Sequence, residues 1–129
     1  MNDIIIKIQN NIERLNYRLN QCYYSDKKIK FYYHEKIRNI KTNILDLKAQ
    51  LIYESNKNDS KIIDLHGANS YFIDYYFDDL LYFKSDIYKD IILITGRGSG
   101  ILYNYTNKHL EKNGYRYKKI NNSKFFIFL

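Results

Sequence analysis

Two stretches decide the fold, KIIDLHG at residues 61–67 and IILITGRG at residues 91–98. The first is a short β-type run, Lys61–His66, that ends at a glycine. The second opens with a continuous apolar run over Ile91–Thr95, which is typical of a strand covered on both faces in a parallel sheet. Residues 70–84 lie between them and repeat apolar side chains at helical spacing. The apolar helical positions are Ile73, Phe77, Leu80 and Leu81, and the positions off that face are Asp74, Asp78 and Lys84.

Two strands joined by a helix form a parallel pair with a right-handed crossover. The chain downstream continues with a second helix over residues 101–113, which ends at Asn113-Gly114 as helices often do. Tyr115–Lys119 and Phe125–Leu129 indicate two strands joined through Asn121-Asn122-Ser123 as a hairpin. The sequence therefore predicts an α/β domain over residues 59–129, a two-layer βαβαββ sandwich with a mixed sheet.

Residues 1–58 show helical rather than β periodicity. Side chains three and four residues apart form a stripe, here called the seam, along one face of each predicted helix. The seam of the first helix consists of Ile5, Ile8, Ile12, Leu15, Leu19 and Cys22. The seam of the second consists of Tyr33, Ile37, Ile40, Ile44, Leu47, Leu51 and Glu54. Tyr24-Ser25-Asp26 breaks the pattern, and Ser25 or Asp26 can cap the second helix. Matching seams and a short join favour an antiparallel helical hairpin, and an intermolecular coiled coil is the alternative. Cys22 is expected to be a buried thiol. The polar segment Asn56–Ser60 marks the junction between the halves.

The charge of the chain points to a polyanionic partner. The net charge is +7 and the isoelectric point is about 9.3, which favours nucleic acid, a ribosome surface or an acidic membrane face. We expect a basic, nucleic-acid-binding face near the C-terminus. Its residues are Lys108, Lys112, Arg116, Lys118, Lys119 and Lys124. No signal peptide or membrane-spanning stretch is visible, so the expected location is cytoplasmic.

Parallel strands end at one edge of a sheet, where open α/β sheets usually place ligands. Side chains alternate along a strand, so Asp64 and His66 project from the same face. Arg97 supplies a planar donor fork suited to a phosphodiester. The glycine-containing turns let backbone amides approach a phosphate, and the next helix offers its N-terminus to an anion. The predicted phosphate-binding residues are Gly67, Thr95, Gly96, Gly98, Ser99 and Gly100. An aspartate, a histidine or a glycine-containing turn taken alone more often has a structural role. Only their meeting at one edge of the sheet indicates a functional site.

These residues resemble a known family. Ile63-Asp64-Leu65-His66-Gly67, then a helix, then Ile94-Thr95-Gly96-Arg97-Gly98, is similar to the Smr (small MutS-related) domain, and the resemblance covers residues 61–129. The helical first half is similar in placement to the extension that precedes Smr domains in several eukaryotic proteins. The resemblance implies an endonuclease that cleaves nucleic acid, and RNA, including ribosome-associated messenger RNA, is favoured over DNA. Carried over by position, Asp64, His66 and Arg97 are the expected catalytic residues.

One departure from the family pattern concerns the end of the glycine-rich turn. Many Smr domains have a His-Ser pair where this chain has Gly100 and Ile101. A non-catalytic RNA- or ribosome-binding module therefore stays open as an alternative, as does an interaction protein that dimerises through residues 1–58. His109 is expected to be a surface residue. We expect no cofactor and no metal, because one Asp and one His supply too few ligands for a closed site. A monomer is favoured.

Overall fold

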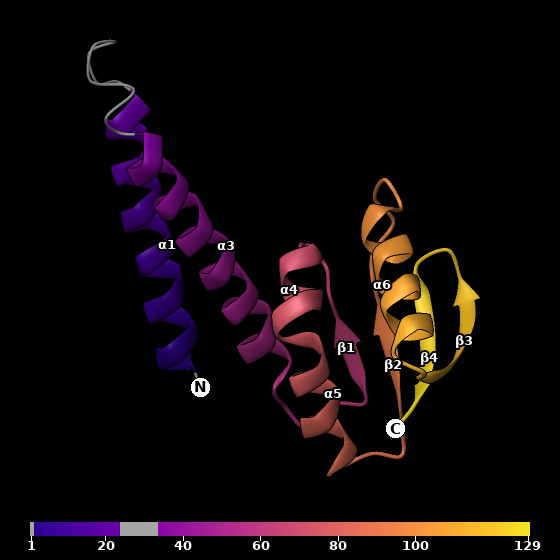
Figure 1. Cartoon of the computed structure of the whole chain (residues 1–129). Coiled ribbons are helices and arrows are strands. Elements are labelled where there is room, and N and C mark those ends of the chain that lie inside the picture. The colour runs from indigo at the N-terminus through magenta and orange to yellow at the C-terminus, as the bar shows by residue number, and fades with distance from the viewer. Residues whose placement is uncertain (1, 24–33) are drawn as a thin grey trace. The chain divides into compact units, whose positions relative to one another are not determined.

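The computed structural model describes residues 2–23 and 34–129 (Figure 1). The chain divides into two compact units, Met1–Leu51 and Ile52–Leu129. The predicted break at Tyr24–Asp26 and the seam residue Tyr33 lie outside the described residues.

The first unit is a pair of antiparallel helices, as Figure 1 shows. Helix α1 covers Asn2–Tyr23 and helix α3 covers His34–Asn56, whose last turn belongs to the second unit. The seam side chains of both helices form one core. Its buried members are Leu15, Cys22, Ile40 and Ile44, with Leu19, Ile37 and Leu47 packed against them. The predicted hairpin and the buried thiol of Cys22 are therefore confirmed, and the seams meet within one chain.

The second unit contains a four-stranded mixed sheet. The strands are β1 (Ile62–Asp64), β2 (Asp90–Ile94), β3 (Arg116–Asn121) and β4 (Lys124–Phe128). Their order in the sheet is β1-β2-β4-β3, in which β1 and β2 are parallel and the other pairs are antiparallel. This confirms the predicted α/β class, the mixed sheet and the C-terminal hairpin.

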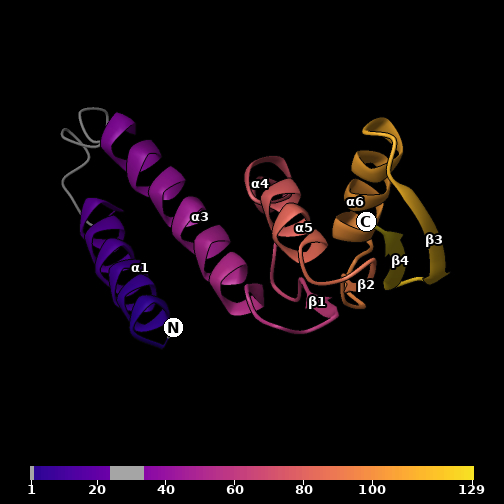
Figure 2. The same ribbon diagram turned by 90° about the horizontal axis from the view of Figure 1, so that it is seen from below.

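Three helices cover one face of this sheet, as Figure 2 shows: α4 (Ser70–Tyr75), α5 (Phe77–Ser85) and α6 (Ile101–Lys112). The single helix expected over residues 70–84 is broken at Tyr76, whose backbone φ is −127°. Tyr76 N–H still donates to the Phe72 carbonyl at 2.9 Å, and its own carbonyl accepts from Leu80 N–H at 3.1 Å. The apolar face therefore continues across the break, and neither proline nor glycine marks it.

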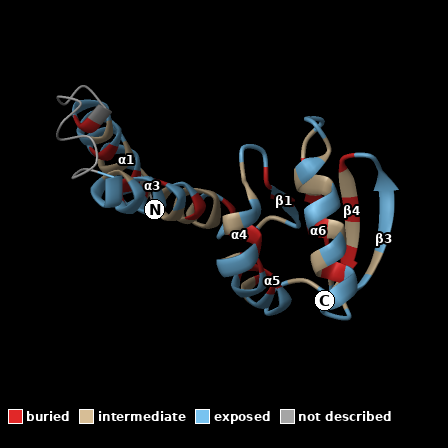
Figure 3. Ribbon diagram, turned by 45° about the horizontal axis from the view of Figure 1, so that its top comes forward, coloured by how far each residue is buried: buried red, intermediate tan, exposed pale blue. Residues whose placement is uncertain are grey.

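The core between sheet and helices contains alternate residues of β1, β2 and β4, and Leu65 just after β1. Ile63, Leu65, Ile91, Leu93, Phe125 and Ile127 are all fully buried. The alternate residues of β2 and β4, such as Ile92 and Phe126, are only partly buried (Figure 3). The expectation that the apolar β2 run is covered on both faces is therefore wrong, because the helices of Ile52–Leu129 all lie on one side. We call the uncovered side, which carries Ile62, Ile92, Ile94, Phe126 and Phe128, the open face.

Lys84 also differs from the sequence prediction, which placed it off the apolar face of its helix. It is fully buried, and its ammonium group donates to the carbonyls of Asn58 and Ser60 at 2.8 and 2.7 Å and to the Asn58 side chain at 3.1 Å. Burial lowers the pKa of Lys84, and the charge of Asp59 opposes that shift. Lys84 thus ties the segment before β1 to α5.

Candidate functional site

The carboxyl ends of β1 and β2 lie side by side. Asp64, the last residue of β1, pairs with Ile94, the last residue of β2. Just beyond them, Leu65 N–H donates to the Ile94 carbonyl at 2.8 Å. The chain therefore leaves both strands at one edge of the sheet, and the two glycine-containing turns follow there.

The alternation of buried and exposed side chains along β1 continues beyond the end of the strand. Ile63 and Leu65 are fully buried, whereas Asp64 and His66 are exposed. The Asp64 carboxylate accepts a hydrogen bond from the backbone N–H of His66 at 2.9 Å. Asp64 therefore fixes the backbone of the turn that carries the histidine.

Asn56, the last residue of α3, holds Asp64 in place. Its side-chain amide donates to the Asp64 carbonyl, its side-chain oxygen accepts from Asp64 N–H, and both distances are 2.9 Å. The same amide donates to the Ile52 carbonyl at 2.9 Å, and Asn56 is 7% exposed. This side chain satisfies the two backbone groups of Asp64 much as a neighbouring strand would. The sequence indicated only a polar junction here, since an asparagine in a polar run carries no sign of burial.

The two turns meet at His66 and Gly96. A Cβ atom built on Gly96 would lie 3.7 Å from Nδ1 of His66. Gly96 also has a positive φ of 83°, a conformation that non-glycine residues adopt at a cost. The positive φ therefore accounts for glycine at this position, whereas a Cβ would make only an ordinary van der Waals contact with the imidazole.

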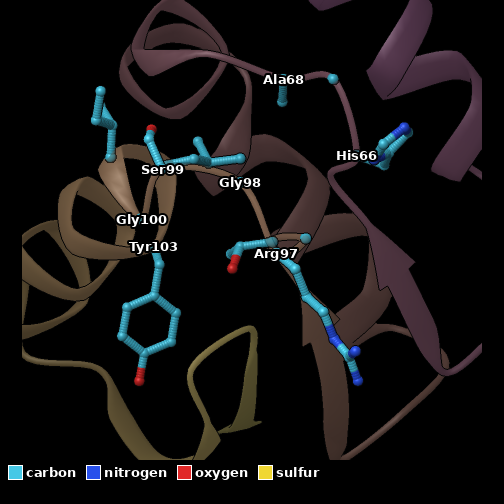
Figure 4. Close-up of a pocket in the computed structure, with 12 residues that line it drawn as sticks. His66, Ala68, Arg97, Gly98, Ser99, Gly100 and Tyr103 are labelled. Carbon is cyan, nitrogen blue, oxygen red and sulfur yellow. The ribbon is translucent and has the colours of Figure 1, made fainter.

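A pocket of about 500 Å³ opens above the glycine-rich turn (Figure 4). It is lined by His66, Arg97 and all six of the residues predicted to bind phosphate. A second hollow of about 480 Å³ shares Gly96–Gly100 and is lined on its other side by Asn121, Asn122 and Ser123. The turn therefore lies between two open hollows, and Asp64 lines neither of them.

The side chains around the turn differ in direction. In Figure 4 the imidazole of His66 and the guanidinium of Arg97 leave their turns in different directions and do not point toward one another. Both are exposed, as is Ser99. The two side chains therefore do not converge on one point in this structure.

Thr95 has a different environment from the rest of the turn. It is 6% exposed, and both its N–H and its hydroxyl donate to the Ser123 carbonyl, at 2.8 and 3.2 Å. Since the hydroxyl proton is already engaged, Thr95 joins the glycine-rich turn to the β3–β4 hairpin.

Helix α6 begins directly after the turn. Gly100 precedes it with a φ of 82°, and no side chain caps its first amides. The backbone N–H groups of the first helical turn therefore have no side-chain acceptor, and residues of that turn, Ile101, Leu102 and Tyr103, line the pocket. Such a helix start favours an anion.

The six basic residues do not form one surface. Lys108 and Lys112 on α6 line a separate hollow of about 440 Å³ together with Asp74, Asp78 and His109. On the open face, Arg116 and Lys118 lie over the Phe128 ring, 5.3 and 5.9 Å from its centre. Lys124 pairs with Ile94 and so shares that face, whereas Lys119 pairs with buried Phe125 and faces the other way.

Sequence reasoning missed a polar cluster between α5 and α6. Asp78 accepts from the Tyr115 hydroxyl at 2.6 Å and pairs with Nε2 of His109 at 2.9 Å. Burial first, and then this hydrogen bond, raise the pKa of Tyr115. The His109 side chain is 15% exposed and lies edge-on to Phe77, so it is a partly buried residue at the surface, where it lines the hollow beside Lys108 and Lys112. The cluster lies away from the glycine-rich turn and joins two helices.

Within residues 2–23 and 34–129, no group of three or more His, Cys, Asp or Glu side chains could hold a metal ion. None of the described helices is long and apolar enough to cross a membrane. Comparisons with protein-family models, curated proteins and solved structures return no match. The function must therefore be argued from the site.

Proposed function

We propose that residues 59–129 form an Smr-type domain that binds the phosphodiester backbone of RNA at the glycine-rich turn and cleaves it. The observation that carries this proposal is the meeting of the two turns. Nδ1 of His66 lies 3.7 Å from the position that a Gly96 Cβ would occupy, beside a pocket whose walls include Arg97 and the glycines. A proton-transferring group and a phosphate cradle thus share one edge of the sheet.

Phosphate binding rests on the turn and on the start of α6. Backbone amides of Gly96–Gly100 and the uncapped helix start supply N–H donors, which favour an anion. Arg97 adds a guanidinium that can hold two phosphate oxygens at once. These donors would stabilise the negative charge that develops on the phosphate during cleavage.

Proton transfer is assigned to His66. An imidazole is a common general base and would remove the proton from an attacking 2′-hydroxyl. The 2′-oxygen then forms a bond to phosphorus and the P–O5′ bond breaks. The leaving 5′-oxygen takes a proton from water or from the protonated imidazole, which leaves a 2′,3′-cyclic phosphate and a 5′-hydroxyl end. Asp64 holds the His66 backbone through its 2.9 Å hydrogen bond and contributes to the position of the ring. The proposed reaction needs no metal, because these side chains and amides supply both the base and the charge stabilisation.

A non-catalytic RNA-binding module is the second candidate. Two observations favour it: the Asp64 carboxylate accepts from the backbone of His66, and Gly100 and Ile101 stand where many Smr domains have His-Ser. In this alternative the glycine-rich turn binds a phosphate of the RNA, and the bound RNA is released intact. Ribosome association is compatible with either candidate.

The deciding experiment incubates purified full-length protein with end-labelled structured RNA and with ribosome-bound RNA, with and without a chelator. His66→Ala should lower the cleavage rate by roughly 10²–10⁴-fold, the usual contribution of a general base. Arg97→Ala should lower it by roughly 10²–10³-fold through lost charge stabilisation. The matched controls are His34→Ala and Arg14→Ala, which remove exposed residues of the helix pair and should leave the rate unchanged.

Two outcomes would reject the catalytic assignment. One is the absence of cleavage by wild-type protein, and the other is equal cleavage by wild type and both variants. Salt-dependent binding that persists in His66→Ala, with no turnover by wild type, would establish the binding module instead.

A further inference from the structure

The open face consists of residues that strand register places in rows. One row crosses all four strands through Ile62, Ile92, Phe126 and Lys118. The next row on one side consists of Asp90, Phe128 and Arg116. Within Ile52–Leu129, every residue of which is described, no helix lies over these rows (Figure 2). Ile62 is 47% exposed and the two phenylalanines are partly exposed.

Two aromatic rings and two cations lie together at the β4–β3 side of this face. The rings of Phe126 and Phe128 are 5.0 Å apart and nearly perpendicular. The Arg116 guanidinium and the Lys118 ammonium both lie within 6 Å of the Phe128 ring centre, at 5.3 and 5.9 Å. Because Arg116 and Lys118 lie over the Phe128 ring, a nucleic-acid base would stack on a platform made of Phe126 and the part of Phe128 that the two cations leave free, and their charge would hold the attached phosphate.

The acidic groups on this face are already engaged. Asp90 forms an ion pair with Lys61, and the Asp64 carboxylate accepts from His66 N–H. Arg116 and Lys118, by contrast, have the Phe128 ring as their neighbour, and so both keep donors for a phosphate. The charge of the platform is therefore positive, in keeping with the chain's net charge of +7.

The open face also leads directly to the candidate site. Asp64, Ile94 and Lys124 form its row at the carboxyl edge, and the turns with His66 and Gly96 begin one or two residues further on. Strands lie about 4.8 Å apart, so four strands span roughly 15 Å, which gives room for two or three bases. A nucleic-acid strand that lies across the sheet could therefore place its next phosphate at the glycine-rich turn.

We propose that the open face binds single-stranded nucleic acid, with bases stacked on Phe126 and Phe128 and phosphates held by Arg116 and Lys118. This inference rests on the proposed function and defines its substrate as an unpaired strand. A duplex fits this face less well, because its bases stack on each other and only its ends present a ring face to the sheet. A second copy of this chain would bring Arg116 and Lys118 of both copies together, which charge repulsion opposes.

The test measures binding separately from cleavage. Full-length protein is titrated into a short fluorescent 2′-O-methyl RNA, which cannot be cut through its 2′-hydroxyl, and into the corresponding duplex. Fluorescence anisotropy gives the affinity. Phe126→Leu and Phe128→Leu keep apolar side chains on the sheet but remove the ring faces. Each should weaken single-strand binding by roughly 5- to 100-fold, the usual loss when a stacking ring is removed.

Two matched controls separate the open face from general charge and aromaticity. Lys118→Ala should weaken binding, whereas Lys119→Ala removes the neighbouring charge on the opposite side of β3 and should have a smaller effect. Tyr82→Leu removes an aromatic ring that is 76% exposed on α5, and it should leave the affinity unchanged. Far-ultraviolet circular dichroism verifies that each variant folds.

Three results would overturn the inference: unchanged affinity in the Phe126→Leu, Phe128→Leu double variant, tighter binding of the duplex by wild type, or wild-type dimers that the double variant abolishes. The last result would make the open face an interface between copies. Failure of the proposed nuclease activity is a distinct outcome. In that case wild type binds the strand and the phenylalanine variants do not, but unmodified RNA stays intact.

Discussion

Asn56 offers a sharp test of how the candidate site is built. Replacing it with leucine keeps the branched shape and the number of heavy atoms at a position that is 7% exposed, but removes every hydrogen bond of the side chain. Two of those bonds satisfy the backbone N–H and carbonyl of Asp64, each at 2.9 Å. In Asn56→Leu both groups lose their partner on the side of β1 that faces away from β2.

The expected loss of stability follows from those two groups. A buried backbone donor or acceptor left without a partner costs about 1–3 kcal/mol. Two such groups give about 2–6 kcal/mol. Water can reach part of this region because the Asp64 side chain is exposed. We therefore expect the free energy of unfolding to fall by about 2–4 kcal/mol.

Urea unfolding followed by circular dichroism measures that change. The control is Asn39→Leu, an exposed asparagine in the same helix, for which we expect a change within about 0.5 kcal/mol. Amide hydrogen exchange gives a second readout, since Asp64 N–H should lose its protection in Asn56→Leu. An Asn56→Leu protein as stable as Asn39→Leu, with Asp64 N–H still protected, would refute the assignment of Asn56 as the partner of β1.

Two further predictions concern stability. Lys84→Met should lower the free energy of unfolding by about 1–3 kcal/mol, because acceptors of Asn58 and Ser60 lose their donor. Burial lowers the pKa of Lys84, so the unfolded chain keeps that proton to higher pH than the folded chain does. The free energy of unfolding of wild type, relative to that of Lys84→Met, should therefore grow as pH rises toward about 10. A constant or shrinking difference in urea unfolding would contradict this. Gly96→Ala should lower the free energy of unfolding by about 1–2 kcal/mol, because the φ of Gly96 is +83°. Gly98→Ala should lower it far less, because its Cβ would meet nothing within 4 Å. Equal thermal midpoints of the two variants would contradict the backbone argument.

Periodicity predicted the fold because the fold depends mainly on it. Steps of three and four residues placed Leu15 and Ile40 in one helix-pair core, and the connecting helix required β1 and β2 to be parallel. Alternation along β1 placed Asp64 and His66 on the exposed side. These are local patterns, and each constrains which face of an element is buried. The roles assigned to the site residues stay predictions.

Lys84 and Asn56 could not be predicted, because their burial depends on partners that only the folded chain supplies. A lysine is almost never fully buried unless it is paired. Lys84 is buried because its amine reaches carbonyls 24 and 26 residues earlier in the chain. Nothing in the helix that contains Lys84 specifies that encounter.

The expectation that β2 is covered on both faces is wrong for a different reason, and that reason bears on function. An apolar residue on a strand shows that a side chain prefers to leave water, but not what covers it. Ile92 and Ile94 made β2 look like a strand between two helix layers, yet the second layer is missing within Ile52–Leu129. On that face the apolar row ends at Phe126, next to Lys118, which is why we propose a ligand with flat rings and negative charge there.

Binding and chemistry are therefore assigned to different strands of one sheet. The groups proposed to hold a nucleic-acid strand lie on β3 and β4, and the groups proposed to transfer protons and bind the reacting phosphate follow β1 and β2. Loss of Phe128 should then change affinity without removing the base, and loss of His66 should change the rate without removing the platform. If one substitution abolished both binding and cleavage in a folded protein, the two sets of residues would form one site rather than two.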